Sequence, residues 1–153
     1  MTLTPQDAEQ AFSPARGRPA WGTRLGVGSF LTVELGDERP ATGTPGTGEP
    51  RPHGEFHVWV YCSAWRIETP TAVLASSEDE RDSLAAAVRV LDGKVLAGAQ
   101  VDTPSLSLTL TFEDGTTLRT FSIFTDGYEH WMLYLPQGDV ITAGPGTAVS
   151  RGT

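Results

Sequence analysis

Apolar and polar residues alternate with a period of two over several segments of the chain, and such alternation predicts β-strands. The clearest example is 106–112, where Leu or Phe at every second position is separated by Ser and Thr. Asp114 and Gly115 follow, a pair suited to the positive φ of a tight hairpin turn, so 116–124 is predicted to return beside the first strand. Similar patterns predict further strands at 27–35, about 94–102, 130–136 and 139–143.

One helix is predicted at about 78–92. Ser77 can cap its first turn, where several acidic residues suit the positive end of the helix dipole, and Gly93 can end it. Apolar residues three or four positions apart would form its buried stripe: Leu84, Val88 and Leu91.

Segment 55–68 is apolar on both of its alternating sides, which predicts a central strand covered on both faces. The side with the smaller residues suits contact with the helix. The other side carries Trp59, Tyr61 and Trp65 and needs a different cover. Sheet curvature, the N-terminal residues, a second copy of the chain in a homodimer, or a ligand would each supply one.

Two stretches lack this periodicity. Residues 1–24 are expected to form a loosely ordered leader, and the Gly-, Pro- and Thr-rich segment 37–54 a long loop between two strands. Residues 25–150 are then expected to form a single α+β domain. Its predicted architecture is a curved, mainly antiparallel sheet of about six or seven strands, with the one helix packed on one face.

Composition narrows the function more than it narrows the fold. The formal net charge of −8 argues against nucleic-acid binding, because phosphate backbones attract basic surfaces. The first residues lack the apolar segment of a secretory signal, and no stretch reaches the roughly 18 apolar residues that span a bilayer. Cys62 is the one cysteine, so no internal disulfide is possible. We therefore expect a cytoplasmic protein without membrane or nucleic-acid partners.

The sequence matches motifs for phosphate binding, metal binding and catalysis only weakly. The glycine-rich run 43–48 is followed by Glu49, where a phosphate-binding loop needs Lys. His53 and His57 on one strand would lie on the order of 13 Å apart, too far to share a zinc ion, although His130 can in principle join His57 across the sheet. We expect neither a metal nor another cofactor. No nucleophile and base can be paired, so an enzyme is the least favoured class.

Polar residues among the aromatic ones mark the candidate binding surface. Arg66 and Glu68 end an otherwise apolar strand, and Glu129 is a candidate ion-pair partner for Arg66. Two interpretations of this Arg66 pair stay open: a structural ion pair, or a pair that orients a ligand. The candidate binding residues, with no catalytic residue among them, are Trp59, Tyr61, Trp65, Arg66, Glu68, Tyr128, Glu129 and Trp131.

Several features between about residues 64 and 150 carry a resemblance to a known family. They are Arg66-Ile67-Glu68 at a strand end, the acidic capped helix, the run from Leu108 to Leu118 with its Asp-Gly turn, Tyr128-Glu129-His130-Trp131, and Gly144-Pro145-Gly146. On these features the chain resembles an uncharacterised family of small actinobacterial domains of unknown function. The resemblance implies no particular activity, but some similar small domains look like immunity proteins of bacterial toxin systems.

These observations favour a non-enzymatic protein-interaction protein, with an immunity-like or antitoxin-like inhibitor as one form of it. Acidity and exposed aromatic area both suit a protein partner. The alternative is a small-ligand-binding protein that uses the aromatic-lined sheet face. A deep aromatic pocket would favour the ligand, and a flat patch would favour the protein partner.

Overall fold

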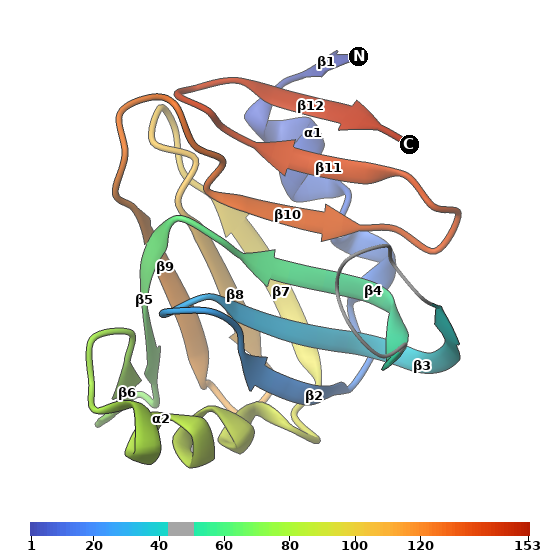
Figure 1. The fold of residues 1–153 in the computed structure, drawn as a ribbon. Helices are drawn as coiled ribbons and strands as arrows, with labels where there is room; N and C mark the ends of the chain where they lie inside the picture. The colour runs from blue at the N-terminus through green and yellow to red at the C-terminus, as the bar shows by residue number, and fades with distance from the viewer. Residues whose placement is uncertain (43–50) are drawn as a thin grey trace.

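The computed structural model describes residues 1–42 and 51–153. Within these ranges twelve strands form two sheets, one of seven strands and one of five, that face each other across a common core (Figure 1). The expected α+β fold, a single sheet with one helix, is therefore wrong. The protein is mostly β, with two short α-helices at the margins of the two layers.

The seven-stranded sheet is antiparallel throughout and stands in front in Figure 1. Its strands, in spatial order, are β1 (Thr2–Leu3), β12 (Val149–Gly152), β11 (Val140–Ala143), β10 (Trp131–Tyr134), β4 (Arg51–Val60), β3 (Leu31–Thr42) and β2 (Ala20–Leu25).

The five-stranded sheet lies behind it and is also antiparallel. Its strands, in spatial order, are β6 (Val73–Ser76), β5 (Ser63–Glu68), β9 (Thr117–Ser122), β8 (Leu108–Phe112) and β7 (Leu96–Val101). Every second residue of these strands points into the core, which explains the alternation in the sequence. The fully buried side chains between the sheets include Leu31, Val58, Leu110, Leu118 and Trp131.

Segment 55–68 is not one central strand. Val58 and Val60 are buried on β4, but after Tyr61 and Cys62 the buried positions become Trp65 and Ile67 on β5. The chain passes from one sheet to the other at this point, so even-numbered residues face the core before it and odd-numbered residues after it. Both sides of the segment look apolar in the sequence because even-numbered residues face the core in β4 and odd-numbered residues face the same core in β5.

The predicted helix lies close to its expected place but is shorter and less regular. It comprises α2 (Arg81–Ala87) and a 3-10 turn, η2 (Val88–Leu91), and it buries the expected stripe of Leu84, Val88 and Leu91. Ser77 does not cap it, because the Ser77 hydroxyl accepts the backbone N–H of Trp65 at 3.1 Å. The pair of helical turns contacts β6 and β2 rather than the predicted face of the 55–68 segment.

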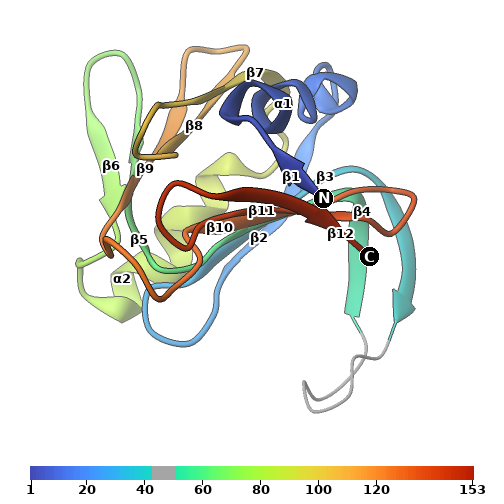
Figure 2. The same ribbon diagram turned by 90° about the horizontal axis from the view of Figure 1, so that it is seen from above.

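Residues 1–24, expected to form a loose leader, instead form ordered elements. They comprise β1, α1 (Pro5–Gln10), the 3-10 turn η1 (Ser13–Ala15) and β2. Thr4 and Asp7 form a capping box at the start of α1. Figure 2 shows α1 beside β7, where the Glu9 carboxylate accepts the Val101 N–H and Arg16 Nε donates to the Ala97 carbonyl.

The predicted turns agree better with the structure than the predicted loops. Gly115 and Gly138, with φ of 89° and 101°, close the β8–β9 and β10–β11 hairpins. The strand expected at 27–35 begins only at Leu31, and Val27 is 81% exposed in the preceding turn. The expected loop at 37–54 is partly strand, since β3 continues to Thr42 and β4 starts at Arg51, and its remainder lies outside the described residues.

Trp65 is a core residue, so its replacement tests the two-sheet arrangement. The side chain is 3% exposed, and its Nε1 donates to the Ser29 carbonyl at 2.7 Å. We expect Trp65→Ala to lower the free energy of unfolding by about 3–5 kcal/mol, measured by urea denaturation. A loss below about 1 kcal/mol, typical of surface positions, would contradict the placement of Trp65 between the sheets.

Asp114 in the β8–β9 hairpin should give the fold a measurable acid sensitivity. The hydrogen bond from the Lys94 side chain, helped by the Thr116 backbone N–H, lowers the pKa of Asp114 to about 2. A carboxyl whose pKa is lowered in the folded state stabilises above its unfolded pKa, and this stabilisation is lost as pH falls toward the folded value, here between about pH 4 and pH 2.

We expect the Asp114 carboxyl to titrate near pH 2 in an NMR experiment and to move back toward the ordinary value of 3.8 in Lys94→Met. A titration of Asp114 that is the same in both proteins would show that Lys94 is not the cause.

Candidate functional site

Three aromatic side chains pack together on the outer face of the seven-stranded sheet. Val58 and Val60 point into the core, so Trp59 between them points outward. The ring centroids of Phe30 and Tyr61 are 4.5 Å apart, those of Trp59 and Tyr61 5.0 Å, and those of Phe30 and Trp59 6.1 Å. We call Phe30, Trp59 and Tyr61 the aromatic cluster. Each ring is partly exposed, and no helix of residues 1–42 and 51–153 covers this face (Figure 1).

The turn between β2 and β3 positions Phe30. The Gly26 N–H donates to the Phe30 carbonyl at 2.7 Å, and the Phe30 N–H donates to the Val27 carbonyl at 3.1 Å. Arg81 at the start of α2 holds this turn from the outside, because its guanidinium donates to the Gly26 and Gly28 carbonyls. The aromatic cluster therefore combines a turn residue, Phe30, with Trp59 on β4 and Tyr61 just after it, and α2 holds the turn.

A hydrogen-bonded pair, Glu34 and His57, borders the aromatic cluster on the same face. Glu34, only 6% exposed, accepts hydrogen bonds from His57 Nδ1 at 2.8–2.9 Å and from the Gly54 N–H at 2.9 Å. Gly22, with φ of 58°, leaves the space, since a Cβ there would lie 3.3 Å from Glu34 Cγ. Tyr134 packs edge-on to the His57 ring at 5.3 Å, and burial raises the pKa of its hydroxyl.

The Glu34–His57 pair has the polarity of a general base. Because a carboxylate only accepts, Nδ1 carries the proton and Nε2 is the nitrogen that can take another. Within the described ranges no hydroxyl or thiol is hydrogen-bonded to His57, so a nucleophile is not in place. The pair instead joins β3 to β4 beneath the aromatic cluster.

Open hollows of the described structure lie elsewhere. One of about 760 Å³ runs beside β7 and is lined by polar residues such as Gln100, Asp102 and Ser105. A second of about 300 Å³ separates β7 from α1 and η1. Neither is lined by a residue of the aromatic cluster, so this cluster forms a surface and not the wall of either hollow.

The predicted binding residues do not form one site. Trp59 and Tyr61 belong to the aromatic cluster, but Trp65 and Trp131 are core residues that are 3% and 0% exposed. Trp131 Nε1 donates to the Leu106 carbonyl, and its ring lies 5.8 Å from that of Phe12. These two tryptophans stabilise the fold and are not accessible to a partner.

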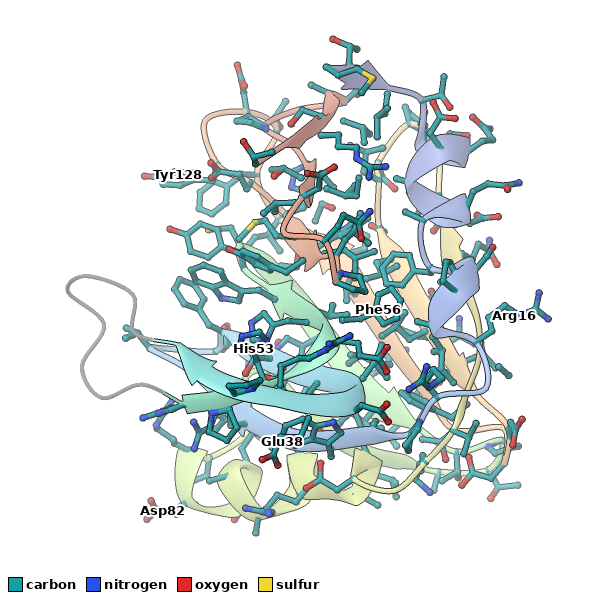
Figure 3. All side chains as sticks on the ribbon, turned by 90° about the vertical axis from the view of Figure 1, so that its right-hand side faces the viewer. Arg16, Glu38, His53, Phe56, Asp82 and Tyr128 are labelled. Carbon is teal, nitrogen blue, oxygen red and sulfur yellow. The ribbon has the colours of Figure 1, made fainter. Side chains whose placement is uncertain are left out.

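The four polar or loop residues of the predicted set separate as well. Arg66 and Glu68 lie on the outer face of the five-stranded sheet, where Arg66 pairs with Glu68 and not with Glu129. Tyr128, which is 49% exposed, follows β9 in the loop before β10 and contacts the Phe124 ring at 4.6 Å. Figure 3 shows Tyr128 on the side of the molecule that bears the outer face of the seven-stranded sheet.

Cys62 lies at the corner between β4 and β5 and is only partly buried. Burial and then the negative charge of Glu129 raise the pKa of its thiol, which disfavours the reactive thiolate.

The two histidines considered as a metal pair are engaged separately. His57 donates to Glu34, whereas His130 Nε2 bonds the Gly146 carbonyl at 2.8 Å. In the part of the chain that the structure describes, no group of three or more potential ligands could hold a metal ion. Among the same residues, no helix is long and apolar enough to cross a membrane.

Sequence reasoning did not find Phe30 or Glu34. Phe30 follows a glycine-rich turn whose conformation has no periodic signal, and the Glu34–His57 contact depends on strand register. One pattern could have indicated this face: His57 and Trp59 are two residues apart on β4 and alternate with buried residues, so they point to the same side of the sheet.

Comparisons of this chain with protein-family models, with curated proteins and with solved structures find no match. The resemblance to small actinobacterial domains therefore stays an expectation, and the functional argument depends on the geometry.

We expect Glu34→Ala to lower the free energy of unfolding by about 1–3 kcal/mol, because the Gly54 N–H and His57 Nδ1 both lose a buried acceptor. Urea denaturation measures the change. Glu38→Ala, an exposed position on the same strand, is the control and should change stability by less than about 0.5 kcal/mol. Equal losses in the two variants would show that the Glu34–His57 pair does not join the strands.

Proposed function

We propose that this chain is a non-catalytic, cytoplasmic protein-binding protein whose partner docks a basic surface on the aromatic cluster. The observation that carries the proposal is the packing of Phe30, Trp59 and Tyr61 on an outer sheet face that no helix of the described residues covers. Partly exposed aromatic side chains in contact with one another are typical of the centres of protein interfaces.

The spacing of the rings favours a protein over a small ligand. Centroid separations of 4.5–6.1 Å mean that the rings contact one another and leave no slot between them. A small molecule would therefore lie on the aromatic cluster with most of its surface in water, whereas a ligand pocket buries most of it. A partner protein supplies the missing cover from its own surface.

Charge supports a basic partner. The chain carries a net charge of −8, which attracts cationic surfaces over long distances. Exposed Glu80 and Asp82 flank the Arg81 side chain that holds the Phe30 turn, and Figure 3 shows Asp82 on the same side as Tyr128. We call Glu80 and Asp82 the acidic rim. Arg24 also faces this side, so the acidic rim does not extend to β2. Arginine can bind the acidic rim and also stack on Trp59 and Tyr61.

The same charge disfavours a second copy of the chain as the occupant, because two chains of net charge −8 repel each other. An immunity-like inhibitor, the role suggested by the resemblance, is one form of this proposal. In that form the basic surface belongs to the toxin.

We expect Trp59→Ala to weaken the binding of an arginine-containing nine-residue peptide by about two- to thirtyfold, the range of one cation–π contact. Fluorescence anisotropy of the labelled peptide measures the affinity. Trp59→Ala should lower the melting temperature much less than Trp65→Ala does, because Trp59 lies on the surface.

Two controls separate the aromatic contact from general attraction to an acidic protein. Val90→Ala removes an apolar side chain that is 40% exposed on η2 and should leave the affinity unchanged. A peptide with citrulline in place of arginine keeps the shape without the charge and should bind more weakly. Equal binding of the two peptides, or equal losses in Trp59→Ala and Val90→Ala, would reject the proposed face.

A further inference from the structure

Two arginines lie directly opposite each other on the outer face of the five-stranded sheet. Arg66 on β5 and Arg119 on β9 are register partners. Their neighbours Ile67 and Leu118 are fully buried, so both arginines point outward, with side chains that are 54% and 53% exposed. Like charges at directly opposite positions destabilise a strand pair. Folding stability alone therefore does not account for this arrangement.

Glu68 compensates only part of the charge. Arg66 Nε lies 2.6 Å from Glu68 Oε2, and Arg119 Nε lies 3.5 Å from Glu68 Oε1. Both guanidinium groups are held through Nε, and within residues 1–42 and 51–153 nothing is bonded to their terminal Nη nitrogens. Two positive charges against one negative charge leave one cation unmatched, on a chain of net charge −8.

The register partners of the two arginines carry hydroxyl groups, and the nearby Asp79 carboxylate is occupied by the Ser76 backbone N–H at 2.9 Å. Ser76 on β6 is the register partner of Arg66, and Thr109 on β8 is the register partner of Arg119. The row across the four strands is therefore Ser, Arg, Arg and Thr, a set in which every side chain can donate. Such a row suits an anionic acceptor lying across the strands.

An apolar side chain stands next to this row. Phe121, two residues after Arg119 on the same face, is 70% exposed, and its partner Ala64 is too small to cover it. Two residues along a strand correspond to about 6.6–6.8 Å. An extended peptide has the same spacing between its own alternate side chains, so it can place one side chain on Phe121 and another on the arginines.

We propose that Arg66, Arg119 and Phe121, here called the arginine face, bind an acidic segment of a partner protein. One carboxylate of the segment is held by the free Nη nitrogens, and an apolar side chain two residues away packs on Phe121. A single carboxylate matches the one unmatched positive charge. A phosphate monoester, with a charge near −2, would bring excess negative charge beside Glu68. The arginine face and the aromatic cluster lie on different sheets, so this proposal does not depend on the proposed function.

The test uses an acetylated and amidated nine-residue peptide with one Glu, one Leu two positions before it, and only Gly, Ser and Thr elsewhere. NMR titration of the full chain should show saturable shifts confined to β5, β6, β8 and β9. We expect Arg66→Gln and Arg119→Gln each to weaken binding by about three- to tenfold, the effect of losing a charged contact that is partly exposed to water. The rest of the chain is acidic and holds this peptide poorly, which keeps the background low.

Arg89→Gln is the matched control, because Arg89 is also exposed and also pairs with a carboxylate, that of Asp92 at 3.5 Å. It should leave the affinity unchanged. In the peptide, Glu→Gln should weaken binding to the unchanged chain as strongly as loss of one arginine, a result that does not depend on the folding of any variant.

Three results would overturn the proposal. They are the absence of saturable shifts at millimolar peptide, an equal loss in Arg89→Gln, and tighter binding of the peptide with phosphoserine in place of Glu, which would identify phosphate as the preferred anion.

Discussion

Two hydrogen bonds to the His130 carbonyl hold the corner between β4 and β5, and this corner determines which side chains face the core and which face outward. The Tyr61 N–H donates to the His130 carbonyl at 3.0 Å, and the Ser63 hydroxyl donates to the same oxygen at 3.0 Å. The chain crosses from one sheet to the other between these bonds. The crossing directs Trp59 outward and Trp65 into the core, because the buried parity changes at the corner. Both proposed binding faces depend on this single change of parity.

The sequence predicted local features well and the global arrangement poorly. The hairpins at Gly115 and Gly138 and the buried stripe of the helix follow from turn chemistry and periodicity, which are properties of neighbouring residues. The number of sheets does not, since a segment that changes sheets has the same two-sided apolar pattern as a central strand. The assignment of Trp65 to a binding face failed for this reason. Contacts such as Glu34 with His57 depend on register, which the pattern of either strand alone does not specify.

The two outer faces present opposite chemistry to a partner. On the seven-stranded sheet, the buried Glu34 carboxylate is hydrogen-bonded to His57, so the exposed groups beside the pair are mainly aromatic. On the five-stranded sheet, Glu68 is shared by two guanidinium groups, and the excess is positive. In the two proposals, the aromatic cluster takes a basic partner and the arginine face an acidic one, because each face disfavours the ligands of the other by charge.

The N-terminal segment has a consequence for the solubility of the protein. A sheet edge with free N–H and C=O groups can recruit a strand from another molecule, which leads to aggregation or domain swapping. At the edge strand β7, the Glu9 carboxylate occupies the Val101 N–H and Arg16 occupies the Ala97 carbonyl, so two charged side chains take the places of a neighbouring strand. A chain that lost its first 16 residues would present an unprotected β7 edge together with the apolar surface that Phe12 covers, and it would assemble edge to edge.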